Sequence, residues 1–202
     1  MSENKILQAD ASYTFRSYFE LPNDTDEILA ELGYSFALAR LDLPRTNREI
    51  DRLPELRQQL EETLPYVSLN SEAAKREILI APVLARVAVT CRLMLRIEYP
   101  LKVSDQLQGT LDYLMRAKHS LVVVEAKRDD LTRGFTQLAA EMIALSMLDD
   151  APEILYGAVT MGHIWVFGHL APQTRLITRD MSAYQLPDDL EELVGILVGI
   201  LE

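Results

Sequence analysis

A carboxylate and an amine lie two residues apart at the end of an apolar run, in the segment LVVVEAK. The run covers residues 121–124 and is followed by Glu125 and Lys127. Because side chains two apart on a strand share a face, this pair would project together from the C-terminal end of a buried strand. Sheets of α/β proteins build their sites at that end, so the pair is a candidate for chemistry.

A second carboxylate, Asp112, interrupts the apolar pattern of LQGTLDYLM, thirteen positions before Glu125 (125 minus 112). If the two strands pair through a turn at residues 117–120, both carboxylates reach one edge of the sheet. Like charges that close repel each other unless a cation lies between them. Lys127 partly meets that need, and a divalent cation with oxygen ligands meets it better. The alternative is that these three residues form a structural salt bridge at the end of the sheet.

This ordered set of residues resembles the PD-(D/E)xK nuclease superfamily, which has the restriction-endonuclease-like fold. The residues that carry the resemblance are Asp112 in GTLDYLM, Glu125 and Lys127 in VVVEAK, and Gln137 in GFTQLAAEM on the helix that follows. Each motif is short, and their order along the chain makes the resemblance more specific.

The segment SEAAKREILIAPVL is similar to part of the N-terminal nuclease segment of type I restriction motor subunits. That segment has a glutamate, a Thr-Arg pair and an Ile-x-Pro-x-Leu ending. Glu72 takes the place of the glutamate, Lys75 and Arg76 that of the pair, and residues 80–84 form the ending. Glu77 is a competing candidate for the glutamate. It lies about 140° around a helix from Glu72, so the two cannot both face one site.

The chain departs from the family pattern at several positions. Lys75 replaces the threonine of the pair, and Leu111 stands before Asp112, where a proline is common. Glu141 lies where the RecB-like branch has a tyrosine, and it shares a helix face with Gln137 because residues four apart are neighbours. The resemblance covers roughly residues 70–165.

The resemblance implies a magnesium-dependent endonuclease that hydrolyses phosphodiester bonds. Asp112 and Glu125 would bind Mg²⁺ or Mn²⁺, and Glu72 would complete that site or help to hold a second ion. Lys127 would orient the attacking water or stabilise negative charge in the transition state. Gln137 would position a ligand or the substrate backbone.

The implied substrate is DNA, and RNA stays open. A second hypothesis is a catalytically silent relative that acts in protein interaction or assembly, because the formal net charge of −11 opposes phosphate binding. A third is an unrelated α/β domain in which the charged residues are salt bridges. Residues 71–133 hold eleven Lys and Arg against eight acids, a local charge of +3. The candidate site therefore lies in the basic third of the chain.

The elements that must position these residues follow the order α-β-β-β-α-β-β-α from residue 70 on. Asn70 would cap the first helix, which Pro82 should kink or break. Strands at 92–102, 107–115 and 120–127 should be antiparallel neighbours, and a helix capped by Asp129 or Asp130 should lead to a parallel strand near 154–162. We therefore expect an α/β fold, bordering on α+β, with a central mixed sheet flanked by helices.

Residues 1–69 are expected to form a mainly helical N-terminal extension packed on the core of residues 70–202. A helix over 25–32 with Thr25 as N-cap, a possible strand near 34–38, and one or two helices over 46–64 around Pro54 make up this extension. A final amphipathic helix, with Asp188 and Glu191 as a capping box, covers the sheet or forms a dimer seam. The N-terminal helices are the other candidate surface for a homodimer.

The composition of the 202 residues predicts a globular cytoplasmic protein. Apolar residues make up 49% of the chain, enough for one sizeable core. Cys91 is the single cysteine, so no intrachain disulfide forms and nothing indicates an oxidising compartment. The N-terminus shows no signal-peptide pattern, and the late run VGILVGIL is too short to span a bilayer. The three histidines lack the spacing of a zinc site.

Overall fold

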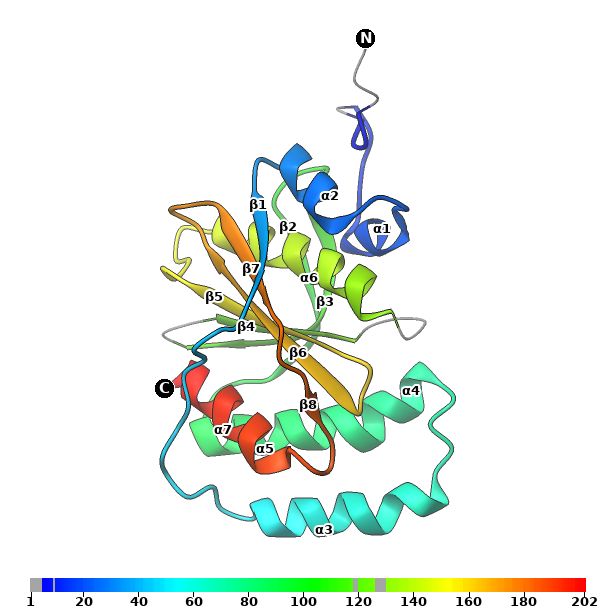
Figure 1. Ribbon diagram of the computed structural model, residues 1–202, viewed down its shortest axis with the longest axis vertical. Helices are drawn as coiled ribbons and strands as arrows, with labels where there is room; N and C mark the ends of the chain where they lie inside the picture. The colour runs from blue at the N-terminus through cyan, green and yellow to red at the C-terminus, as the bar shows by residue number, and fades with distance from the viewer. Residues whose placement is uncertain (1–4, 9, 118–119, 126–129) are drawn as a thin grey trace.

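The computed structural model describes residues 5–8, 10–117, 120–125 and 130–202, with backbone only for 120–125. Within these residues, eight strands form one mixed sheet flanked by helices, so the predicted α/β class is confirmed (Figure 1). The strand order across the sheet is β1-β7-β6-β5-β4-β3-β2, with β8 paired to β6. The strands are β1 (Ser35–Ala39), β2 (Arg96–Lys102), β3 (Gln108–Arg116), β4 (Ser120–Glu125), β5 (Leu155–Thr160), β6 (Ile164–Ala171), β7 (Leu176–Asp180) and β8 (Tyr184–Gln185).

The helices cover the two faces of the sheet in separate groups, visible above and below it in Figure 1. One face packs against α1 (Phe15–Glu20), α2 (Thr25–Glu31) and α6 (Leu131–Ser146). The other packs against α5 (Ala81–Cys91) and α7 (Leu190–Leu201), with α3 (Leu53–Thr63) outside them. Two buried apolar clusters result, one on each side of the sheet.

The central strands pair as their spacing predicts. Neighbours β2, β3 and β4 are antiparallel, and β4 is parallel to β5 across α6. A parallel pair requires a crossover connection, and the buried helix α6 supplies it. Asp130 caps that helix, because its carboxylate accepts the N–H groups of Thr132 and Arg133 at 3.0 Å. Asp129 lies outside the described residues.

The helical segment before β2 begins one residue later than predicted, because Ser71, and not Asn70, is its N-cap. The hydroxyl of Ser71 accepts the Ala74 N–H at 3.1 Å. Regular α-helix in α4 (Glu72–Lys75) gives way to a π-helical turn, η2 (Arg76–Ile80), before α5. Pro82 lacks an N–H and its ring crowds the carbonyl four residues back, which explains why the helix loosens there. The predicted interruption is confirmed.

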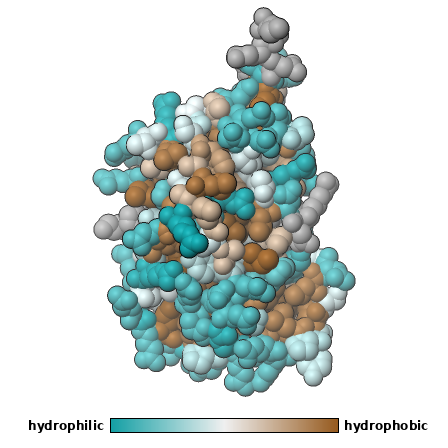
Figure 2. Space-filling view, in the orientation of Figure 1, coloured by the Kyte–Doolittle hydropathy of each residue, from teal (hydrophilic) through white to brown (hydrophobic). Residues whose placement is uncertain are grey.

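The N-terminal segment contributes to the sheet as well as to the helical layers. The predicted strand near 34–38 is β1, which lies at one edge, parallel to β7. Figure 2 shows apolar side chains gathered over this edge, and Leu38 on β1 is exposed. Thr25 is not the N-cap of α2. Asp24 holds that position, and the buried Thr25 hydroxyl lies 2.7 Å from the hydroxyl of Thr136 on α6.

The remaining N-terminal helix, α3, begins at Leu53 and has Pro54 in its first turn, where a missing N–H carries no penalty. A 3₁₀ turn, η1 (Leu64–Tyr66), follows it directly. One helix, not two, therefore occupies the predicted 46–64 segment. The division of the chain at residue 70 stays a prediction.

The C-terminal helix α7 covers the sheet, because its apolar stripe is buried within the chain. The capping box predicted for this helix is wrong. Asp189, not Asp188, is the N-cap, and Glu191 forms an ion pair with Arg57 on α3. The Asp189 carboxylate accepts the Gln185 N–H at 2.7 Å. Among the helices of the described ranges, none is long and apolar enough to cross a membrane.

Candidate functional site

Strand β3 changes faces at Asp112. Leu111 belongs to the apolar cluster beneath α6, whereas Tyr113 belongs to the cluster beneath α5 and α7. Residues two apart on a regular strand share a face, so β3 departs from regular alternation between them. On the facing strand, Glu98 lies between the partners of these two residues and has a left-handed backbone with φ +51°. Asp112 is thereby brought to the boundary between the two helical layers.

A cavity of about 420 Å³ opens at this boundary. It is lined by Thr14, Arg16, Arg76, Glu98, Gly109, Thr110, Asp112 and Gln137. These residues come from four parts of the fold: the start of α1, the π-helical turn η2, the strand pair β2–β3 and the helix α6. Two of the predicted site residues, Asp112 and Gln137, are therefore brought to one cavity.

Arg76 places a cation in this cavity. It lies at the first position of η2, and π-helical turns frequently occur at functional sites. Its guanidinium forms an ion pair with Glu98 at 3.6 Å and lies over the ring of Tyr113, 5.5 Å from the centroid. Its Nε donates a long hydrogen bond to the Tyr113 hydroxyl at 3.5 Å. These contacts hold the positive charge beside Asp112, where it can attract an anionic ligand.

Gln137 presents a buried amide to the same cavity, with only 3% of the residue exposed. Its Nε2 donates a hydrogen bond to Oε1 of Glu141 at 3.0 Å, so the shared helix face predicted for these residues is confirmed. Within the part of the chain that the structure describes, Gln137 Oε1 has no hydrogen-bond partner. Burying a carbonyl oxygen without a donor is unfavourable. Gln137 therefore lines the cavity with a buried amide whose oxygen is unsatisfied among the described residues.

The helix that carries Lys75 and Arg76 packs against the turn after β5, which lies beside the end of β4. Glu125, the last residue of β4, pairs with Thr160 on β5, and Gly162 follows in the next turn. A Cβ atom added at Gly162 would lie 3.2 Å from Lys75 Cβ. The backbone of Gly162 is left-handed, with φ +90°. This close approach requires glycine. The strand end of the predicted signature and the helix of the predicted Lys-Arg pair are thus neighbours.

The other predicted site residues either lie outside the described part of the chain or do not line the cavity. The backbone of Glu125 ends β4, but its side chain and all of Lys127 lie outside what the structure describes. Glu72 and Glu77 are both exposed, and neither is among the described residues that line the cavity. Glu72 lies one turn before Arg76 and so shares its helix face.

The oxygen atoms of the residues that line the cavity are of the type that Mg²⁺ binds. Asp112 and Glu98 offer carboxylate oxygens, and the Gln137 amide oxygen is buried without a donor. Mg²⁺ prefers oxygen ligands and commonly uses one or two carboxylates together with waters and substrate phosphates. In the described ranges no group of three or more His, Cys, Asp or Glu side chains could hold a metal.

Five lining residues have no counterpart among the predicted site residues: Thr14, Arg16, Glu98, Gly109 and Thr110. Thr14 and Arg16 lie in a segment without a family resemblance, and no spacing links them to β3. Glu98 does have a signal in the sequence, because it interrupts the apolar run of its strand as Asp112 does.

Comparison with known proteins finds no family model that matches the chain and no match among curated proteins. The function must therefore be argued from the site itself.

Proposed function

We propose that this protein is a metal-dependent nuclease that hydrolyses phosphodiester bonds, with DNA as its substrate. The observation that carries the proposal is that Asp112, Gln137 and Arg76 line one cavity. They come from β3, α6 and the turn η2, three elements that are far apart along the chain. Three residues of a family pattern that converge in space support the pattern more strongly than their order in the sequence does.

The sheet around the site supports the same proposal. The restriction-endonuclease-like fold implies a central mixed sheet flanked by helices. Here three antiparallel strands, β2 to β4, lead through α6 to the parallel strand β5, with helices on both faces. The cavity opens beside β3, next to the strand that ends in Glu125.

The acidic and basic residues would have different roles. Asp112 and Glu125, with Glu72 as a third candidate, would hold Mg²⁺ or Mn²⁺, and the Gln137 amide oxygen offers a further ligand or a contact to a bound water. The chemistry that such an ion supplies is polarisation of the phosphate and activation of a coordinated water. Lys127 would orient that water. Arg76 would balance the negative charge of the phosphate as it is attacked.

The proposed setting is the cytoplasm, which agrees with a single cysteine, Cys91, that is free. DNA is the first substrate to test because the resemblance points to it, and RNA is the second. The net charge of −11 predicts weak binding at physiological salt, so cleavage is best sought at low ionic strength.

The test is cleavage of plasmid DNA, single-stranded DNA and RNA with Mg²⁺ or Mn²⁺, with and without a chelator. Asp112→Asn and Lys127→Ala should each lower the cleavage rate by about 10²-fold or more. Matched controls are Asp105→Asn and Lys102→Ala, because this exposed pair, 2.8 Å apart, lies outside the lining of the cavity. Exposed ion pairs contribute little to stability, so both controls should keep the wild-type rate.

The proposal fails if the purified protein shows no metal-dependent cleavage of any of the three nucleic acids at low salt. That result would favour the catalytically silent module. Cleavage that survives in both Asp112→Asn and Lys127→Ala would instead indicate a contaminating nuclease.

A further inference from the structure

The N-terminal helix α1 is fastened to the strand that carries Asp112. Thr14 forms an isolated bridge with Gln108 at the start of β3, and Gly109 follows with φ +143°. A side chain at Gly109 would lie 3.2 Å from the backbone nitrogen of Phe15, so this close approach depends on glycine. The contact brings the first turn of α1 to within a few residues of Asp112 along β3.

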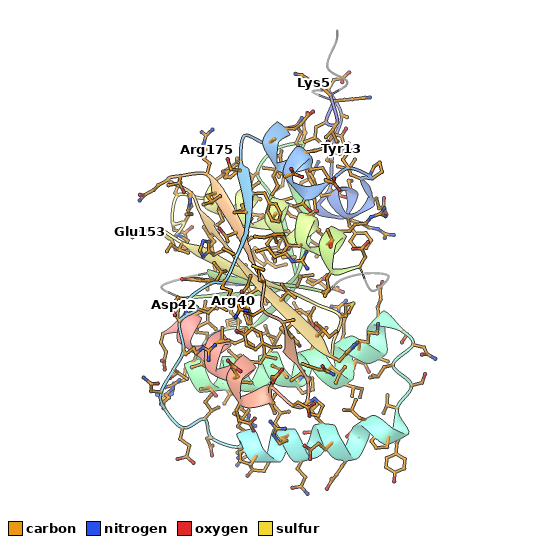
Figure 3. All side chains as sticks on the ribbon, in the orientation of Figure 1. Lys5, Tyr13, Arg40, Asp42, Glu153 and Arg175 are labelled. Carbon is orange, nitrogen blue, oxygen red and sulfur yellow. The ribbon has the colours of Figure 1, made fainter. Side chains whose placement is uncertain are left out.

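Two tyrosines strengthen the attachment. Tyr13 precedes α1 and is labelled in Figure 3. Its backbone N–H donates a hydrogen bond to the Asp105 carbonyl at 2.9 Å. The hydroxyl of the buried Tyr18 donates to the Gln106 carbonyl at 2.8 Å. The position of α1 is therefore set by several independent contacts to the loop before β3, and it does not depend on one side chain.

This attachment places Arg16 at the cavity of Asp112. The side chain of Arg16 is 64% exposed, and its Nε pairs with Glu20, one turn further along α1, at 3.1 Å. Together with Arg76 it is one of two cations in the lining, which also contains the carboxylates of Glu98 and Asp112. Arg16 thus lies where a ligand that occupies the cavity would pass into solvent.

We propose that Arg16 binds a backbone phosphate of the nucleic acid, next to the phosphate that is hydrolysed. This inference rests on the proposed function and assigns a substrate-contact role to the N-terminal segment. The guanidinium matches phosphate oxygens with two parallel N–H donors. Because the protein as a whole is strongly acidic, local cations at the cavity must supply the attraction for a polyanion. Glu20 competes with the phosphate for the same guanidinium.

The test is metal-free binding of fluorescently labelled duplex and single-stranded DNA, measured by anisotropy over a series of salt concentrations. Arg16→Gln should weaken binding by about tenfold for all sequences. It should also lower the slope of log K against log salt by about one, the value for one lost phosphate contact. Glu20→Gln should act in the opposite direction, because it releases Arg16 from its ion pair.

The matched control is Arg48→Gln. Arg48 is also a half-exposed arginine in an ion pair, with Glu202 at 2.9 Å, but it does not line the cavity. This variant should keep the wild-type affinity and slope. Thermal unfolding of all three variants verifies that they are folded, since exposed ion pairs contribute little to stability.

The inference is overturned if Arg16→Gln keeps the wild-type affinity and salt slope, or if the wild-type protein binds no nucleic acid. Its failure is distinguishable from that of the proposed function. Binding that depends on Arg16 without any cleavage supports the contact and contradicts the nuclease. Cleavage with normal binding by Arg16→Gln contradicts the contact and keeps the nuclease.

Discussion

The amide of Gln137 donates a hydrogen bond to the carboxylate of Glu141, 3.0 Å away on the next turn of α6, and both residues are buried. The pair orients the Gln137 amide so that its Nε2 is used within the helix, while Oε1 has no partner among the described residues. The carboxyl group of Glu141 thus takes up the amide N–H of Gln137 and leaves the amide oxygen without a described partner.

The Gln137–Glu141 pair should stabilise the fold. Gln137→Leu keeps most of the side-chain volume but removes the hydrogen bond to Glu141 and leaves that buried carboxyl oxygen without a donor, so the free energy of unfolding should fall by about 2 kcal/mol. Urea denaturation measures this. The control is Gln58→Leu, which breaks the same kind of pair with Glu62 on the surface of α3, at 2.7 Å. It should change stability by less than about 0.5 kcal/mol, and equal losses in the two variants would contradict the buried role.

Gly109 should be indispensable to the placement of α1. An added Cβ would lie 3.0 Å from Phe15 Cδ2 in a backbone conformation that other residues rarely adopt. Gly109→Ala should therefore destabilise the protein by about 2 kcal/mol, as measured by thermal unfolding. Gly195→Ala in α7 is the control, because apart from the neighbouring backbone no atom of the described residues lies within 4 Å of the new Cβ. It should stabilise by about 0.5–1 kcal/mol, and a Gly109→Ala protein as stable as wild type would disprove the requirement.

Glu98 should carry backbone strain. With φ +51° it occupies a left-handed conformation that only glycine adopts without a steric penalty. Glu98→Gly should be more stable than Glu98→Ala by about 1 kcal/mol in chemical denaturation. At Arg96, on the same strand and not among the positive-φ residues, the order should reverse, with alanine the more stable substitution. Alanine preferred at both positions would rule out strain at Glu98.

Stability should fall in acid because of His169 on β6. Burial lowers the pKa of its imidazole below the ordinary value of 6.5. The unfolded chain therefore binds a proton more readily, so stability contributed by the neutral ring is present above about pH 6.5 and is lost as pH falls further. Urea midpoints measured between about pH 8 and pH 5 should fall less steeply for His169→Gln than for wild type. His163→Gln keeps His169 and should follow wild type, while parallel curves for all three proteins would refute the assignment.

Much of the fold is determined by patterns that are local in the sequence. Alternation and turn residues specify β2, β3 and β4, and the stripe that follows Asp130 specifies α6. Local pattern also places Asp112 on a strand and Gln137 beside Glu141, because residues four apart on a helix must be neighbours. Some errors lie at the ends of elements, at Asn70, Thr25 and Asp188, where capping depends on which neighbouring side chain reaches the backbone first. The predicted element order is also wrong after α6, where four strands, β5 to β8, precede the last helix in place of two.

The tertiary structure alone decides what surrounds Asp112. The change of face in β3 at that residue depends on how Leu111 and Tyr113 divide between two apolar clusters, and no periodicity in the sequence predicts that division. Arg16 reaches the cavity because Gly109 lets a helix from a distant part of the chain approach β3. Contacts of this kind depend on which surfaces pack together and not on sequence spacing. The sequence by itself therefore determines which residues can do chemistry, and packing decides which of them meet.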